Sequence, residues 1–592
     1  RSSAASDVYK RQLFRTLHNF SMISSAAWIA RGIAARHPEK HQLDDAELER
    51  ISKLTNTELG EAERQLAQAQ AAADDGWEDV DEDEDEDDDD NEDEAMDEDD
   101  AGGDPNDLSR YKLDDYDKEP AQNVAMGALS GIRGVQFFRS NDDDPYLTMK
   151  EDPADEAEER EQLEVLPTDN MLLTAKTEDD VSMIEAYVYS SQDQNLYVHH
   201  DLLLPSFPLH LEWLDYTPAP MLDESQQQGQ GGRAAGAPGN FVAVGTMDPE
   251  IEIWNMDTIE CMYPDSVLGR KDLTAALDAP SGTGKKKRRV PKARVPNDSY
   301  HVDAVLSLSW NRRVRNLLAS ASADTTVKMW DLSRPMSGTS SSALRSFSGH
   351  TDKVQSVAWQ VGAPGMASGT ENPAVLLSGS YDKTIRVYDT RMPEQAMIAR
   401  IGADVEAVRW NGWKDHAFLV ALESGTVHGF DVRALSPQGT DAALYTLVAH
   451  DGACTSLDIS PHIPGCLLTA GTDRQVKLWS IDDEDTDKPR SINLVTARDL
   501  GIGKIFTTSF SPNDPLTVAA AGSGGKLHIW DTLANPGMRR TFGDRLRRLD
   551  QYAARHAVDL SHVQLDDRAE RSADVEVDDD AESDEDDDAE MQ

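Results

Sequence analysis

Residues 301–331 read HVDAVLSLSWNRRVRNLLASASADTTVKMWD, and this stretch decides the fold. An apolar run ends at Trp310, a run of small residues leads to Asp324, and a third run closes in Trp330. The alternation of polar and apolar residues over 326–330 is what a half-buried β-strand requires. The stretch therefore predicts three consecutive β-strands joined by short turns.

The same pattern returns along the chain. Two further strong copies begin at His350 and His450, and weaker copies occupy residues 165–190, 207–257, 403–433 and 502–532. The aromatic residues that close the third strand of each copy are Tyr189, Trp254, Trp330, Tyr388, Phe430, Trp479 and Trp530. A repeated unit of about 40–45 residues is typical of propeller blades, which are four-stranded sheets arranged around an axis. The sequence thus predicts an all-β fold, a β-propeller with seven blades.

Two acidic blocks lie outside the repeats. Residues 78–100 contain 19 Asp or Glu in 23 positions, and residues 574–590 contain 12 in 17. Such blocks repel themselves and have no apolar surface to bury, so we expect disordered acidic extensions at both ends of the fold. The net charge of -53 therefore belongs largely to these extensions and does not exclude nucleic acid as a partner.

These observations predict the following boundaries. The propeller occupies residues 161–535 and carries polar insertions at 223–240 and 264–300. Before it we expect a non-native leader at 1–21, because these residues read unlike native sequence, an arm with a short amphipathic helix at 22–72, and an acidic disordered region at 73–160. After it we expect a helical segment at 536–571 and an acidic tail at 572–592.

The repeats resemble those of the WD-repeat family, in which a His, a Ser or Thr, an Asp and a Trp form one chain of hydrogen bonds within a blade. Tyr388 stands at the Trp position of the second copy, so we expect that chain to be altered. We interpret these side chains as structural and not catalytic. The matching sets are His301, Ser320, Asp324 and Trp330; His350, Ser378 and Asp382; and His450, Thr469, Asp473 and Trp479.

No motif of the sequence predicts an enzyme or a cofactor. The glycine-rich residues 279–285 have Ala279 where a phosphate-binding loop needs its first Gly, and Lys286 where it needs a hydroxyl. His199 and His200 are adjacent, and neighbours on a strand point to opposite faces, so we do not expect one metal ion to bind both. Three cysteines without paired spacing predict neither a zinc site nor a disulfide framework.

A basic cluster stands out in this acidic chain. It consists of Lys285, Lys286, Lys287, Arg288, Arg289, Lys292 and Arg294, within the second insertion. It indicates a nuclear import signal or a contact with a polyanion such as RNA; an ordinary solvated loop is the alternative. Ser583 has an acidic surround typical of acidophilic kinase sites, which predicts phosphorylation. No run of 18 apolar residues is present, so we expect no membrane association.

Segments outside the repeats resemble the periodic tryptophan protein 1 family, a eukaryotic WD-repeat family. They include the stretch from Trp28, the arm from Leu43 to Ile51, the acidic block and the basic insertion. Further matching stretches begin at Leu172, Leu196, Glu212 and Gly245.

The resemblance implies a nucleolar, non-enzymatic factor that acts in large ribosomal subunit assembly and pre-rRNA processing. Its expected partners are pre-ribosomal particles, meaning rRNA and assembly factors, together with basic ribosomal proteins, and we expect a monomer within a large complex. A histone-binding or chromatin-regulating module, acting on transcription of ribosomal genes, is the alternative.

Overall fold

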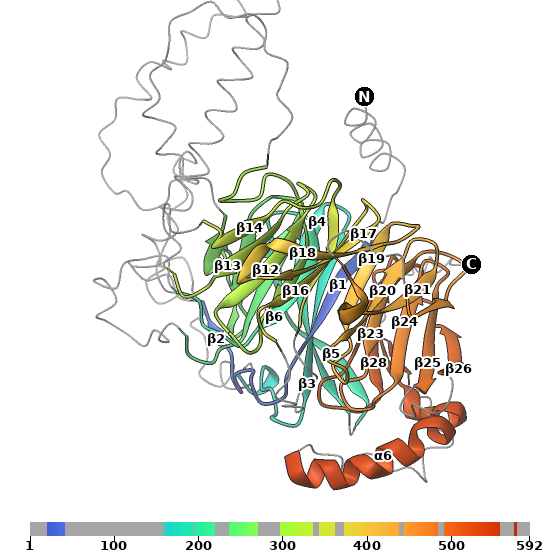
Figure 1. Ribbon diagram of the computed structural model, residues 1–592. Coiled ribbons are helices and arrows are strands. Elements are labelled where there is room, and N and C mark those ends of the chain that lie inside the picture. Colours follow the sequence, from blue (N-terminus) through green and yellow to red (C-terminus); the bar gives the residue numbers. More distant parts are fainter. Residues whose placement is uncertain are drawn as a thin grey trace, which may run out of the picture. The chain divides into compact units, whose positions relative to one another are not determined.

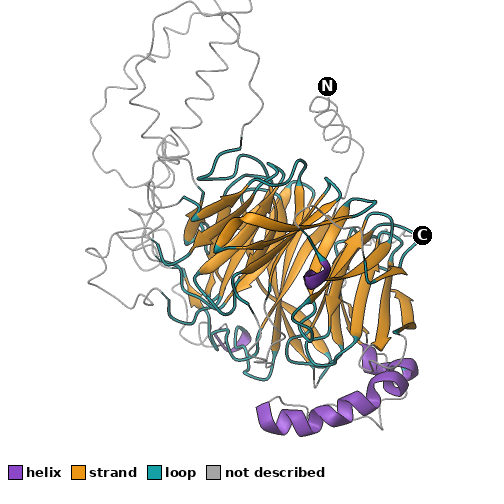
Figure 2. Cartoon of the chain, viewed as in Figure 1, coloured by secondary structure: helices purple, strands orange, loops and turns teal. Residues whose placement is uncertain are grey.

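Seven four-stranded antiparallel sheets stand around a common axis, which confirms the predicted seven-bladed β-propeller (Figures 1 and 2). The computed structural model describes residues 21–41, 158, 160–191, 193–219, 236–269, 296–334, 342–360, 372–436, 443–482, 490–556 and 574–576. The predicted short helix before residue 72 and the acidic block at 78–100 lie outside these residues, as do the basic cluster and Ser583.

The blades are numbered along the chain, and the strands of each run from the axis outward. Blade 1 is β1 (Ser21–Ile29), β3 (Asn170–Glu178), β4 (Val181–Ser190) and β5 (Asn195–Leu204); blade 2 is β6 (Pro208–Leu214), β7 (Phe241–Thr246), β8 (Ile251–Asn255) and β10 (Ser266–Leu268); blade 3 is β11 (Val305–Trp310), β12 (Leu317–Ser322), β13 (Val327–Asp331) and β14 (Arg345–Phe347); blade 4 is β15 (Val354–Trp359), β16 (Val375–Ser380), β17 (Thr384–Asp389) and β18 (Met392–Arg400).

The remaining three blades repeat the same order. Blade 5 is β19 (Val405–Trp410), β20 (Ala417–Leu422), β21 (Thr426–Asp431) and β22 (Tyr445–Val448); blade 6 is β23 (Cys454–Ile459), β24 (Cys466–Gly471), β25 (Gln475–Asp482) and β26 (Ser491–Asp499); blade 7 is β27 (Ile505–Phe510), β28 (Thr517–Gly522), β29 (Leu527–Asp531) and β30 (Asp574–Glu576). A small parallel sheet joins β2 (Glu39–Lys40) to β9 (Thr258–Ile259).

The aromatic residues that close the third strand of each repeat form the core between the blades. All seven are buried, with exposed fractions from 0% at Trp254 to 7% at Trp479. Trp330 of blade 3, for example, packs in one cluster with Phe241 and Ile253 of blade 2. Burying large side chains between neighbouring sheets contributes on the order of 2–3 kcal/mol each, which holds the blades together.

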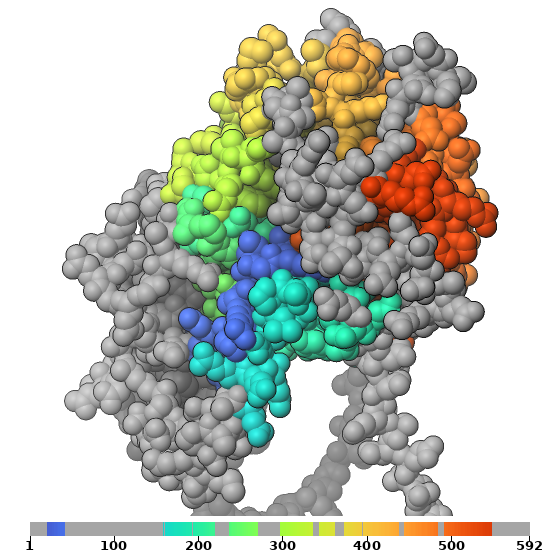
Figure 3. Space-filling model, turned by 90° about the horizontal axis from the view of Figure 1, so that it is seen from below, coloured from blue at the N-terminus to red at the C-terminus, as the bar shows by residue number. Residues whose placement is uncertain are grey.

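Blade 1 is built from two distant parts of the chain. Its innermost strand β1 pairs with β3, and Trp28 lies opposite Leu172. In Figure 3 the blue segment with residues 21–41 lies against the cyan residues of the first blade. The predicted boundaries of a leader ending at residue 21 and an arm at 22–72 are therefore wrong, because residues 21–29 belong to the propeller. Ile23 and Ile29, both fully buried, supply the core contacts that fix this strand.

Two other boundaries also differ from the prediction. The insertion predicted at 264–300 includes β10, whose residues are all buried because Val267 and Leu268 complete the core of blade 2. The acidic tail predicted at 572–592 includes β30, which adds a fourth strand to blade 7 by pairing with β29. Backbone hydrogen bonds to an open sheet edge explain how an acidic segment joins a blade.

A single long helix lies between β29 and β30 in the part of the chain that the structure describes. Helix α6 (Pro536–His556) begins at the predicted residue and lies below the strands in Figure 2. Its buried residues Met538, Phe542 and Leu546 pack into the cluster shared by blades 6 and 7. Arg545 also anchors the helix, because it binds the carbonyl of Pro464 and the carboxylate of Asp482.

Candidate functional site

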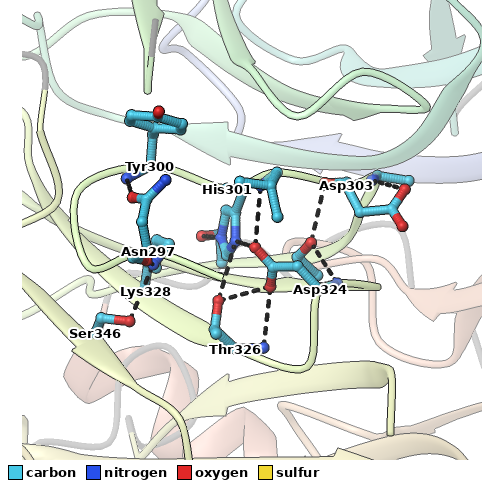
Figure 4. A network of polar contacts seen from close by, with 12 residues as sticks. Asn297, Tyr300, His301, Asp303, Asp324, Thr326, Lys328 and Ser346 are labelled. Carbon is cyan, nitrogen blue, oxygen red and sulfur yellow. Dashed lines mark hydrogen bonds and ion pairs between the residues drawn. The ribbon is translucent and has the colours of Figure 1, made fainter. Parts of the chain in front are cut away.

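The structure brings the four residues of the first predicted set together within blade 3. His301 Nδ1 lies 3.0 Å from Asp324 Oδ2, and His301 Nε2 lies 2.7 Å from Ser320 Oγ. The Trp330 indole donates to the same Ser320 oxygen at 2.8 Å. Figure 4 shows His301 and Asp324 side by side, with Thr326 hydrogen-bonded to both.

The direction of these bonds follows from the two ends of the chain, because the Asp324 carboxylate only accepts and the Trp330 indole only donates. His301 therefore donates its Nδ1–H to Asp324, and its neutral ring accepts at Nε2 from the Ser320 hydroxyl, whose oxygen accepts from Trp330. This is the order of bonds in a catalytic Ser–His–Asp triad. His301 and Ser320 are fully buried, however, so the hydroxyl has no access to a substrate in solution.

Burial controls the charges of this network. It lowers the pKa of His301, which keeps the imidazole neutral. Burial by itself would raise the pKa of Asp324, but the bonds from His301 and Thr326 outweigh it and hold that pKa at about 2. Asp324 is thus a charged group that orders the turn between β12 and β13, which is a structural role.

The other two sets repeat this geometry with one difference each. His450 Nδ1 lies 2.9 Å from Asp473 Oδ1, and Thr469 Oγ1 takes the place of the serine at 3.0 Å from Nε2. Trp479 donates to Thr469 at 2.9 Å. In blade 4, His350 lies 2.9 Å from Asp382 and 2.7 Å from Ser378. Tyr388 replaces the indole there, as the sequence shows, and burial raises its pKa to about 12.

The three Asp residues mark one face of the propeller, which we call the Asp face. Each begins a tight turn between the second and third strands of its blade. The next residue has a positive φ: 70° at Thr325, 63° at Lys383 and 66° at Arg474. Non-glycine residues seldom adopt this conformation, and the Asp side chain stabilises it by accepting the N–H two positions later.

A central channel runs between the innermost strands of all seven blades and holds a cavity of about 660 Å³. Each innermost strand contains a register shift near its first residue, and such a bulge re-aims side chains. The extra residues of these bulges all line the cavity: Ser24, Leu209, Leu306, Gln355, Glu406, Thr455 and Phe506.

Side chains on the channel wall also link successive blades. They accept hydrogen bonds from backbone N–H groups of the next innermost strand, and eight such bonds cross five of the seven blade junctions of the described ring. The pairs of acceptor and donor residue are Ser25 and Leu211, His210 and Leu308, Glu212 and Trp310, Ser307 and Val357, Ser309 and Trp359, Ser356 and Val408, Ser456 and Thr508, and Asp458 and Phe510. We call this series the channel belt.

Two junctions lack these bonds among the described residues and use other contacts. Between blades 5 and 6, Ala407 and Arg409 occupy the acceptor positions, and the indole of Trp413 donates to the carbonyl of Ser460 instead. Between blades 7 and 1, Arg31 binds both carboxylate oxygens of Asp514 at 2.7 Å. Sequence reasoning missed these contacts, because neither carries a local pattern.

The orientation expected for His199 and His200, on opposite faces of the strand, is wrong. Between β4 and β5 the register shifts, and His199 is the extra residue. The bulge turns both rings to the same side, with the two Nδ1 atoms 2.7 Å apart. His199 Nε2 is held by the carbonyl of Leu163, and burial lowers the pKa of His200 to about 3.

Within the described ranges, no three His, Cys, Asp or Glu side chains gather as metal ligands would. The same residues include no helix with the length and apolar composition to cross a bilayer. The three cysteines, which all lie in described segments, are free thiols.

Known proteins resemble this chain over nearly its whole length. A family model described as WD domain, G-beta repeat matches residues 297–331, 341–389 and 442–480. A WD repeat-containing protein of Schizosaccharomyces pombe is 38% identical over 558 residues, 93% of this chain and 95% of its own. Periodic tryptophan protein 1 of Saccharomyces cerevisiae is 31% identical over 580 residues, 90% of this chain and 92% of that protein.

More distant relatives share only part of the propeller. Histone acetyltransferase type B subunit 2 of Debaryomyces hansenii is 24% identical over 254 residues, which is 40% of this chain and 58% of that protein.

Proposed function

Because the chain belongs to the periodic tryptophan protein 1 family of WD-repeat proteins, we propose that it is a non-enzymatic scaffold in the nucleolus. In this role it serves large ribosomal subunit assembly and pre-rRNA processing. The observation that carries the proposal is the 31% identity to the yeast protein over 90% of the chain, which includes segments outside the repeats.

The architecture suits a docking platform. The channel belt and the buried aromatic residues hold the blades as one rigid ring, so that loops on both faces keep fixed positions relative to one another. The three His–Asp sets are buried and used for structure, which leaves them without a catalytic task. Several partners can therefore be held at once without a chemical step.

The charge distribution along the chain supports rRNA and basic proteins as partners. The basic cluster at 285–294 neutralises phosphates without reading base sequence, which suits contact with rRNA or nuclear import. The acidic blocks at 78–100 and 574–590 attract basic proteins, and ribosomal proteins are strongly basic. We propose that the protein enters large-subunit precursor particles as a monomer through these two kinds of contact.

Sedimentation tests this proposal. We expect the tagged protein to migrate with large-subunit precursors at low salt and to be released progressively as salt rises, because counterion release weakens phosphate contacts. Free migration at low salt contradicts the proposal. A variant with residues 285–294 replaced by a Gly/Ser linker of equal length separates contacts of the basic cluster from those of the ring.

A histone-binding module that regulates transcription of ribosomal genes is the second candidate. The similarity to a histone acetyltransferase subunit favours it, although the match covers 40% of the chain. The acidic blocks would then contact histones. Recovery of histones with the tagged protein after RNase treatment supports this candidate, whereas loss of all partners after RNase supports the ribosomal one.

A further inference from the structure

Two charged side chains of β19 line the channel without joining the belt: Glu406, which accepts from the Tyr381 hydroxyl, and Arg409. We count along each innermost strand from the residue before its bulge. The fifth residues of the seven strands form one layer around the channel. Glu212, Ser309 and Asp458 of this layer accept an N–H from the next blade. Arg409 holds the same position in blade 5 and has no acceptor to offer. The full layer is Ala27, Glu212, Ser309, Ala358, Arg409, Asp458 and Ser509.

Arg409 remains accessible although it lies on the innermost strand. Its side chain is 50% exposed, and its Nε is 3.9 Å from Asp458 Oδ1, beyond hydrogen-bond distance. Arg312, exposed on the loop after β11, lines the same cavity. Two exposed guanidinium groups, from blades 3 and 5, therefore border the channel, and that of Arg409 also forms a long ion pair with Asp458.

Both guanidinium groups act on the same two carboxylates. Burial raises the pKa values of Glu212 and Asp458, and Arg312 and Arg409 counteract that rise in each case. The two carboxylates come from blades 2 and 6, so the four charged groups converge from four blades. Glu212 and Asp458 are already held by backbone N–H groups, which fixes them as the frame of the site.

We propose that the channel binds an acidic peptide of a partner protein and holds one of its Asp or Glu carboxylates between Arg312 and Arg409. The guanidinium fork matches a carboxylate in two-point hydrogen bonding. A singly charged group suits the site better than a phosphate dianion, because Glu212 and Asp458 already balance much of the positive charge. A volume of about 660 Å³ is in the range that takes up a short peptide segment. This site is independent of the ribosomal role proposed above.

Fluorescence anisotropy of labelled hexaglutamate, titrated with the full chain, tests the site. We expect Arg409→Gln and Arg312→Gln each to weaken binding by about tenfold, since each removes charge-assisted hydrogen bonds. Arg391→Gln is the matched control: it removes the same charge from a side chain that is 65% exposed on the outer part of blade 4. Binding by this variant should equal that of the wild type.

Three results overturn the proposal. They are absence of hexaglutamate binding by the wild type, equal weakening by Arg391→Gln and Arg409→Gln, and binding of a phosphoserine peptide in place of hexaglutamate. Thermal unfolding of each variant shows whether the ring is intact. If Arg409→Gln does not fold, Arg312→Gln decides alone, because Arg312 lies on an exposed loop.

Discussion

Arg31 and Asp514 are 483 residues apart in the chain, and their side chains meet at 2.7 Å, joining the first blade to the seventh. Asp514 is almost fully buried and Arg31 is 15% exposed. Asn170 donates to the same carboxylate, and Arg31 also binds the hydroxyl of Ser191. The contact closes the ring at a junction that lacks channel-belt bonds among the described residues.

Arg31→Ala should therefore destabilise the whole propeller. The change leaves the Asp514 carboxylate buried without its cation, and breaking such a pair costs about 3–5 kcal/mol. Chemical denaturation followed by tryptophan fluorescence measures it. Arg36→Ala is the control, because Arg36 pairs with Glu164 from a side chain that is 66% exposed. Equal stability of the two variants would mean that the pair does not close the ring.

Ser320→Ala tests the hydrogen-bond set of blade 3. The change leaves the Trp330 indole and His301 Nε2 buried without their shared partner, for a loss of about 2–3 kcal/mol. Ser333→Ala, in an exposed turn, should change the free energy of unfolding by less than about 0.5 kcal/mol. Urea denaturation compares the two. The structural interpretation fails if Ser320→Ala is no more destabilising than Ser333→Ala.

Lowering the pH should reduce the free energy of unfolding, partly because of His200. Its folded pKa of about 3 lies below the unfolded value of about 6.5, so the unfolded chain binds the proton first as pH falls. The stability that the neutral, buried His200 contributes is thus fully present above pH 6.5 and is lost below it. The free energy of unfolding falls by about 2 kcal/mol between pH 7 and pH 5. His200→Gln should remove that part of the pH dependence, measured by urea denaturation at both pH values. Between pH 7 and pH 8 the variant and the wild type should show the same slope, and a wild-type slope in the variant below pH 7 contradicts the assignment.

Helix α6 should depend on Phe542. This side chain is fully buried in the cluster of blades 6 and 7, and Phe542→Ala should cost about 3–4 kcal/mol. Arg547→Ala removes an ion pair with Asp544 in which both side chains are mainly exposed, so the expected change is below about 0.5 kcal/mol. Limited proteolysis and thermal unfolding measure both. Docking of the helix through Phe542 is refuted if the two variants behave alike.

The basic cluster should direct the protein to the nucleus. Replacing residues 285–294 with a Gly/Ser linker should move a fluorescent fusion to the cytoplasm, as seen by microscopy. A double change of exposed arginines, Arg391→Gln with Arg433→Gln, should leave the fusion in the nucleus. Nuclear accumulation of the linker variant shows that another segment carries the signal.

The fold was predictable because its signal is local. Each blade contains an aromatic residue, such as Trp330 or Trp479, at the end of a strand with period-two alternation, and this pattern can be recognised within about 30 residues. The hydrogen-bond sets follow from the same spacing. Helix α6 was also predictable, from a run of Arg, Leu and Ala after the last blade.

The closure of the ring was not predictable in this way. β1 pairs with β3 across 140 intervening residues, so no contiguous repeat contains both strands. The contact between Arg31 and Asp514 depends on the closed ring itself. His199 and His200 were misjudged because a one-residue bulge reverses the alternation that the sequence suggests. The place of Arg409 in the layer of acceptor side chains follows only from the register of the seven innermost strands.

In-cell crosslinking of the tagged protein to RNA tests the ribosomal role most directly. We predict that crosslinked reads map mainly to precursor rRNA of the large subunit, and that they decrease when residues 285–294 are replaced. Crosslinks absent from rRNA, together with histone recovery that survives RNase, would contradict the ribosomal role and favour the chromatin module.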